Sequence, residues 1–167
     1  MNYNLIKVID KELTPVERVL TNRGIDLSEV EHYLNTTDDD IFNPELLNNM
    51  REGAQMLIKN ISNNVDTQIC VDPDVDGFSS AALLINYLYK LFPAYVLTHL
   101  TYKLQEGKEH GIIPERISEN IKFVIAPDSS SNSVIECAEM ASRGADVLIL
   151  DHHEVDTPAA TACIINN

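Results

Sequence analysis

The chain has 167 residues, of which 44% are hydrophobic, and a formal net charge of −14. This length suits one domain with a real core. The negative net charge argues against a protein that binds nucleic acid over its whole surface, because contacts to phosphate need lysine and arginine. It suits a protein that gathers divalent cations, and it is compatible with a nucleic-acid enzyme whose basic surface lies in another segment.

The cysteines and the N-terminus bear on the cellular compartment. Cys70, Cys137 and Cys163 form no CxxC pair, so they indicate neither a zinc ribbon nor a disulfide framework. The first residues, MNYNLIKVIDKE, lack the basic region and the apolar stretch of a signal peptide. No run approaches the roughly 18 apolar residues of a membrane span. We therefore expect a cytoplasmic protein that does not enter the membrane.

Residues 1–66 are polar and rich in Asn and Asp, and we expect them to form a helical N-terminal lead-in. Pro15 and Pro44 stand where proline commonly opens a helix, and Gly24 stands where a helix commonly ends. Hydrophobic spacing and these signals predict helices over residues 16–20, 27–34 and 45–62.

Residues 67–167 change to short apolar runs that alternate with helical patterns. The predicted strands cover residues 67–71, 95–99, 121–126, 147–150 and 162–165. The predicted helices between them cover residues 78–91, 114–120 and 133–143. Continuous apolar runs are typical of strands that are covered on both faces. We therefore expect an α/β domain, with a doubly wound, mainly parallel sheet of about five strands and right-handed crossovers.

Acids and histidines follow three of these strands, at the edge where an open parallel sheet binds its ligands. They are Asp72, Asp74, Asp76, Asp128, Asp151, His152 and His153. Their mutual repulsion requires an explanation, which one or two divalent cations provide. Carboxylate and imidazole ligands suit Mn²⁺, and also Mg²⁺ or Fe²⁺.

Each part of this cluster also has a purely structural explanation. The three acids of DPDVDG could form a helix cap and turn, although the Glu that would complete a calcium-binding loop is absent. Asp128 alone could be a turn residue. The convergence of all three segments at matching strand ends is what favours a metal site.

Three neighbouring segments could contribute to the same site. Gly77 permits a sharp turn from strand to helix. Ser79 and Ser80 fall in the first turn of the next helix, where they could bind a substrate phosphate or only satisfy the helix terminus. In 129–133 (SSSNS) we favour capping of the next helix, by Asn132 or Ser133, over lining the pocket. Basic residues of a loop could touch phosphates or simply be solvated: Lys103, Lys108 and His110.

The sequence resembles a known family at these positions. DPDVDG at 72–77, Asp128 and DHH at 151–153 resemble the first three motifs of the DHH phosphoesterases in order, strand-end placement and spacing. The resemblance is closer to the RecJ-like single-strand exonucleases, whose lead-in is similar to LTNRGID and FNPELLNNMREGAQML. The segments EGKEHGI and PAATACIINN are also similar to that branch.

The resemblance implies roles for individual residues. It makes Asp74, Asp76, Asp128 and His152 ligands of Mn²⁺ or Mg²⁺. Asp72 either joins them or acts through a hydrogen bond, Asp151 is a ligand or orients one, and His153 contacts the phosphate. Asp76, His152 and His153 would be the catalytic residues. Other branches carry a histidine where this chain has Cys70, which favours the branch that relies on Asp72.

The resemblance also implies a function. We expect a metal-dependent phosphodiesterase that cuts single-stranded DNA from an end. Alternatives are a phosphoesterase acting on nanoRNA, 3′-phosphoadenosine phosphate or cyclic dinucleotides, and a non-catalytic binding domain with a degenerate site. The family has a fourth aspartate motif and a C-terminal substrate-binding domain farther along. The chain therefore resembles the N-terminal metal domain of a longer enzyme.

Overall fold

The computed structural model describes residues 12–105 and 109–166, so Lys108 of the expected basic loop lies outside the described residues. Two compact units make up the chain, Met1–Asn43 and Pro44–Asn167. Within the described ranges, no helix has the length and apolar character needed to cross a membrane.

The first unit contains short helices, as the sequence predicts. Helix α1 (Pro15–Asn22) begins with a capping box, in which the Glu17 amide donates to Thr14 Oγ1 and the Thr14 amide donates to the Glu17 carboxylate. The predicted second helix opens as a 3₁₀ turn (Leu27–Glu29) and continues as α2 (Val30–Leu34). Another 3₁₀ turn, Asp38–Asp40, follows.

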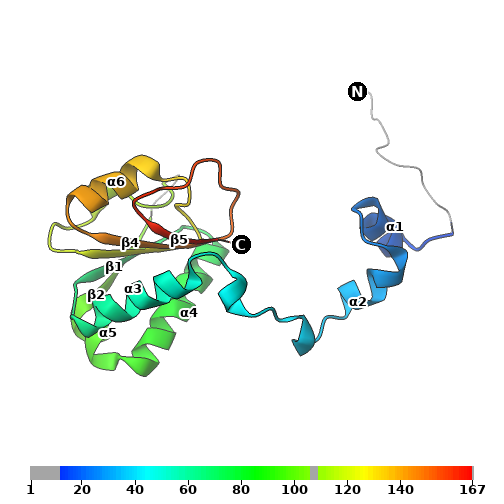
Figure 1. The fold of residues 1–167 in the computed structure, drawn as a ribbon, viewed down its shortest axis with the longest axis horizontal. Helices are drawn as coiled ribbons and strands as arrows, with labels where there is room; N and C mark the ends of the chain where they lie inside the picture. Colours follow the sequence, from blue (N-terminus) through cyan, green and yellow to red (C-terminus); the bar gives the residue numbers. More distant parts are fainter. Residues whose placement is uncertain (1–11, 106–108, 167) are drawn as a thin grey trace. The chain divides into compact units, whose positions relative to one another are not determined.

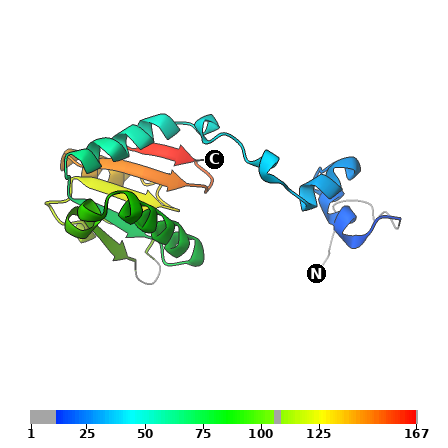
Figure 2. The same cartoon turned by 90° about the horizontal axis from the view of Figure 1, so that it is seen from below.

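The second unit is built on a parallel sheet, which confirms the expected fold class. Its five described strands run in the order β2-β1-β3-β4-β5, and every neighbouring pair is parallel (Figures 1 and 2). The strands are β1 (Thr67–Val71), β2 (Leu100–Leu104), β3 (Phe123–Pro127), β4 (Asp146–Asp151) and β5 (Cys163–Asn166). Strands β1 and β3 are buried along their whole length. This agrees with the apolar sequence of β3, and in β1 the buried residues include the polar Thr67 and Gln68.

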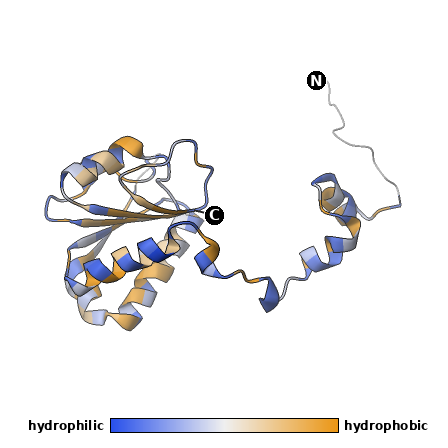
Figure 3. Cartoon of the chain, in the orientation of Figure 1, coloured by the Kyte–Doolittle hydropathy of each residue, from blue (hydrophilic) through white to orange (hydrophobic). Residues whose placement is uncertain are grey.

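Helices cover both faces of the sheet. Figure 1 shows α6 (Val134–Ser142) on one face, and α3 (Met50–Ser62), α4 (Val75–Leu91) and α5 (Pro93–His99) on the other. Hydrophobic residues run along the strands between these layers (Figure 3). Strand residues alternate between the two cores, so Val124 packs with Met140 on the α6 face while Phe123 and Ile125 pack with Ala81 on the other. Helix α3 adds Met56 to that second core, although the sequence assigns it to the lead-in.

Two sequence predictions for the segments between β1 and β3 are wrong. Residues 95–99 form the end of helix α5 rather than a strand, and the strand begins at Leu100. Pro93 occupies the first turn of that helix, and the Tyr95 hydroxyl reaches the Val65 carbonyl oxygen at 3.0 Å. The helix expected over 114–120 is reduced to a 3₁₀ turn, Pro114–Arg116.

The helix expected over 45–62 is divided in two. A 3₁₀ turn covers Pro44–Leu46, and α3 begins only at Met50. Asn49 interrupts the helix with a φ of 60°, in the left-handed region, and its side chain donates to the Ile164 carbonyl oxygen at 2.8 Å. A tertiary contact to β5 therefore sets the start of this helix.

Candidate metal centre

The predicted site residues come together at the carboxyl edge of the sheet. Strands β3 and β4 are paired in register so that Pro127 lies opposite Leu150, and the Asp128 amide donates to the Leu150 carbonyl oxygen at 2.7 Å. Asp128 and Asp151 are thereby delivered by adjacent strands. Asp72 arrives at the same edge from β1, on the other side of β3.

The three acids after β1 have three different environments. Asp72 is buried, and both of its carboxylate oxygens lie 3.2 Å from His110 Nδ1. Asp74 caps α4, since its Oδ1 accepts from the Gly77 amide at 2.9 Å. Asp76 is exposed in the first turn of α4. The helix-cap explanation therefore holds for Asp74, and it does not account for Asp72 or Asp76.

Gly77 is required by a close approach of two backbone segments. A Cβ at this position would lie 2.6 Å from both the Cβ and the carbonyl oxygen of Asp72. Gly77 itself is helical and is not among the described residues with positive φ. Only a residue without a side chain lets α4 start this close to the end of β1.

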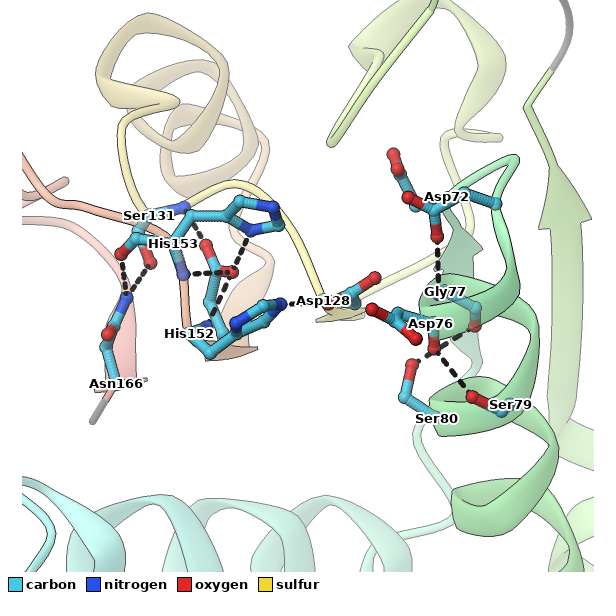
Figure 4. Close-up of polar contacts among 12 residues, drawn as sticks. Asp72, Asp76, Gly77, Ser79, Ser80, Asp128, Ser131, His152, His153 and Asn166 are labelled. Carbon is cyan, nitrogen blue, oxygen red and sulfur yellow. Dashed lines mark hydrogen bonds and ion pairs between the residues drawn. The ribbon is translucent and has the colours of Figure 1, made fainter. Parts of the chain in front are cut away.

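The hydroxyl groups of Ser79 and Ser80 serve their own helix. Ser79 Oγ donates to the Asp76 carbonyl oxygen at 3.2 Å, and Ser80 Oγ donates to the Gly77 carbonyl oxygen at 3.1 Å (Figure 4). Both hydroxyl groups therefore bond to backbone carbonyl oxygens within the first turn of α4, and neither accepts from a free amide of the helix N-terminus in these contacts.

Asp128 is a buried carboxylate with half of its hydrogen-bonding capacity unused. Its Oδ1 lies 3.0 Å from His152 Nε2, while its Oδ2 has no partner among the described residues. Burial, together with the nearby negative charge of Asp74, raises the pKa of Asp128. Its backbone adopts a φ of 67°, a strained conformation of the kind found at functional sites. A cation next to Oδ2 would relieve both the desolvation and the missing contact.

Asp151, in contrast, is fully engaged. Its Oδ2 accepts from the Ser131 amide at 3.1 Å, and its Oδ1 accepts from the His152 amide at 2.8 Å and lies 2.7 Å from His153 Nδ1 (Figure 4). Burial opposes ionisation, but the hydrogen bonds from Ser131 and His153 outweigh it and lower the pKa of Asp151 to about 2. The same contact raises the pKa of His153. This geometry suits a carboxylate that orients a histidine.

Asp128, His152 and His153 form a group that could hold a metal ion. One ligand atom from each lies within 4.8 Å of the others. The two imidazole rings lie with their centroids 4.5 Å apart. In Figure 4 Asp128 lies between His152 and Asp76, and the charge of Asp76 also acts on Asp128. One carboxylate and two imidazoles could hold a transition-metal ion such as Mn²⁺.

A cleft of about 320 Å³ opens beside this group. Its walls include five of the predicted site residues, namely Asp72, Asp74, Asp128, Asp151 and His153. Asp76 and His152 do not line it. The rest of the wall comes from His110, Gly111 and residues 129–133.

The segment around His110 is fastened to the turn after β3. Ser130 Oγ accepts from the Ile112 amide at 3.0 Å, and a Cβ on Gly111, which has a φ of 75°, would lie 2.6 Å from that oxygen. The sequence pointed to His110 only as a basic loop residue. Its contact with Asp72 is a long-range contact that no local pattern signals.

The role expected for residues 132 and 133 is wrong. Ser133 occupies the N-cap position of α6, but no side chain caps that helix. Asn132 instead contacts the loop that follows His153, and Asn166 contacts Ser131 and His153. The alternative that residues 129–133 line the pocket therefore fits better for Asn132, whereas no sequence signal pointed to Asn166, because its partners are distant in the chain.

Comparisons with known proteins identify a family and similar folds. Residues 67–167 match the DHH family, N-terminal domain. The chain is 33% identical, over its whole length, to the putative SPbeta prophage-derived single-strand DNA-specific exonuclease YorK of Bacillus subtilis (strain 168), of which it spans 28%. It is 31% identical over 149 residues, 85% of the chain, to the single-stranded-DNA-specific exonuclease RecJ of the same strain, of which it spans 18%.

Two solved structures share the fold. The structure of RecJ from Thermus thermophilus in complex with Mn²⁺ covers 72% of the chain with a TM-score of 0.58 and 21% identity, and the match spans 17% of that protein. A structure of exonuclease RecJ bound to manganese covers 75% of the chain with a TM-score of 0.63 and 20% identity, and the match spans 33% of that protein. The chain spans less than a third of the curated relatives named here. Because the match to the family's N-terminal domain extends over residues 67–167, more than half of the chain, the protein belongs to the DHH family.

Proposed function

We propose that this protein is a metal-dependent phosphodiesterase that degrades single-stranded DNA from an end. The observation that carries the proposal is the buried Asp128, whose Oδ2 has no partner among the described residues and whose other oxygen meets His152 beside the cleft. The names of the relatives, single-strand DNA-specific exonucleases, support the substrate. The manganese in the solved RecJ structures supports the choice of Mn²⁺ over Mg²⁺.

The chain's own residues divide the work as follows. Asp128 and His152 would hold a first ion. Asp74, which lines the cleft, and Asp76, in the first turn of α4, would be available for that ion or for a second. Such an ion, when bound, acidifies water and offsets negative charge on a phosphate. Asp72 would keep His110 in place, or join the ligands.

The remaining site residues would orient the substrate. Asp151 holds His153 through Nδ1, which leaves Nε2 of that ring for a phosphate oxygen. Ser79 and Ser80 would face a second phosphate oxygen if their hydroxyl groups turned away from the first turn of α4, where free amides favour an anion. The free thiols of Cys70, Cys137 and Cys163 support a cytoplasmic location.

The test is nucleotide release from end-labelled single-stranded DNA by the natural full-length protein in Mn²⁺. Asp76→Ala and His152→Ala should each lower the rate at least about 100-fold, since each removes a proposed ligand or catalytic group. Both side chains are exposed, so circular dichroism should show an intact fold.

The matched control is Asp39→Ala, which removes an exposed acid from the first unit and should leave the rate unchanged. Full turnover in either site variant would refute the assignment. A wild-type protein that binds Mn²⁺ but cuts no DNA would instead favour a binding domain.

A further inference from the structure

One side chain joins the turn after β3 to the loop after β4. Asn132 Nδ2 donates to the Glu154 carbonyl oxygen at 2.9 Å, and its Oδ1 accepts from the amides of Asp156 and Thr157 at 2.8 and 3.2 Å. These three hydrogen bonds use both ends of the amide group. They tie the segment that follows Asp128 to the segment that follows His153.

Asn166 at the end of β5 supplies a second tie. Its Nδ2 lies 3.0 Å from both Ser131 Oγ and the His153 carbonyl oxygen (Figure 4). Asp151 connects the same parts, because its carboxylate accepts from the Ser131 amide. The backbone of His153 is therefore held from one side by β5, while Asn132 holds the loop immediately beyond it.

The two histidines need such support, because packing does not fix them. Their side chains are 55% and 58% exposed, whereas the carboxylates that they contact, Asp128 and Asp151, are 5% and 2% exposed. An exposed imidazole keeps its place chiefly through its backbone and its hydrogen bonds. A change in the loop at 154–157 would therefore move the imidazoles relative to the buried Asp128.

We propose that Asn132 is a positioning residue, which holds the loop after β4 so that His152 faces Asp128 at metal-binding distance and His153 stays beside the same site. The inference rests on the proposed function, because it assumes that Asp128 and His152 bind the ion. The alternative, that Asn132 serves helix α6, does not fit, since the side chain makes no capping hydrogen bond there. Residues that orient metal ligands commonly change metal affinity or activity about 10- to 100-fold when they are replaced.

The experiment compares Asn132→Ala and Asn132→Leu with the wild type in the natural full-length protein. Mn²⁺ affinity is measured by electron paramagnetic resonance, the thermal midpoint is measured without metal, and nucleotide release is followed as Mn²⁺ is increased. Both variants should bind Mn²⁺ about 10-fold more weakly or worse. They should behave alike, because alanine removes volume and leucine keeps it, while both lose all three hydrogen bonds.

The metal-free midpoint should change little, since Asn132 is exposed, and saturating Mn²⁺ should restore most of the rate. The control is Asn63→Ala, which removes only a bond to the Lys59 carbonyl oxygen at the end of α3 and should leave Mn²⁺ binding unchanged.

Three results would overturn the proposal. The first is unchanged Mn²⁺ affinity in both variants, and the second is a loss of affinity in the alanine variant alone. The third is a fall in the metal-free thermal midpoint large enough to account for the weaker Mn²⁺ binding. If the wild type itself binds no Mn²⁺, the proposed function fails. If the wild type binds Mn²⁺ and cuts DNA while the variants match it, only the positioning role fails.

Discussion

Gly77→Ala offers the sharpest test of how the site is built. The added Cβ would lie 2.6 Å from the Cβ and the carbonyl oxygen of Asp72, and 2.9 Å from its carbonyl carbon. Ordinary van der Waals contact begins near 3.4 Å, so α4 and the end of β1 would have to separate by about 0.8 Å. Overpacking of this kind costs about 1–3 kcal/mol, and the helix propensity of alanine returns at most about 1 kcal/mol. We expect a net loss of about 1–2 kcal/mol in the free energy of unfolding.

The assay is urea unfolding of the metal-free protein, followed by Mn²⁺ titration. Because the clash is with the residue that begins the acidic motif, Mn²⁺ affinity should fall together with stability. Gly53→Ala in α3 is the matched control: its Cβ would meet Ile165 Cδ1 at 2.6 Å and Leu148 Cδ1 at 3.0 Å, which are ends of side chains that can rotate away. Gly53→Ala should therefore be neutral within about 1 kcal/mol. A Gly77→Ala protein as stable as the wild type, with unchanged Mn²⁺ binding, would refute the reasoning.

Three further predictions concern the same edge of the sheet. The pKa of Asp151 is about 2 in the folded protein and roughly 3.9 in the unfolded chain, so its ionised form stabilises the metal-free fold above about pH 4. The free energy of unfolding should fall by roughly 2 kcal/mol as the pH is lowered to 2. Urea titrations at several pH values should show this loss of unfolding free energy in the wild type and a smaller loss in Asp151→Asn. An equal dependence on pH in the two proteins would contradict the prediction. Mn²⁺ at 100 times its dissociation constant should add about 2.7 kcal/mol, and an unmoved thermal midpoint would speak against a preformed site. Asp128→Asn should raise the free energy of unfolding of the metal-free protein by roughly 1 kcal/mol, because it removes a buried charge next to Asp74. It should also abolish the stabilisation by Mn²⁺. A metal-free variant less stable than the wild type would show that the charge of Asp128 does not destabilise the metal-free fold.

The sequence carries most of the information that places the site. Strand β3 is a short apolar run bounded by polar residues, and β1 ends in the apolar residues 69–71, a pattern that favours burial on both faces. Once a parallel sheet is inferred, the residues after its strands must share an edge. Asp72, Asp128 and Asp151 could therefore be grouped without coordinates.

Other features depend on contacts that no local pattern encodes. Residues 95–99 include Val96 and Leu97 and look extended, yet Pro93 opens a helix there and Tyr95 binds to Val65. In the same way, an Asn after a strand commonly caps a helix, whereas Asn132 finds its partners 22 to 25 residues away. For Asn132, tertiary hydrogen bonds outweigh the local capping preference, whereas for residues 95–99 the proline before them itself favours a helix.

The repulsion among the acids is only partly relieved by the protein itself. One oxygen of Asp74 accepts a hydrogen bond from the Gly77 amide, and the carboxylate of Asp72 lies beside His110. The carboxylate of Asp151 accepts from the Ser131 amide and contacts His153. Each of these carboxylates has a protein group that offsets its charge.

Asp128 does not have such a group for its second oxygen among the described residues, although it is the central carboxylate and is buried. An unsatisfied buried group of this kind costs about 1–3 kcal/mol, more when it is charged. Folding could have avoided that cost with one additional donor, as it did at Asp151. A buried carboxylate oxygen without a donor, beside two imidazoles and an open cleft, is the arrangement expected of a site that binds a cation from solution.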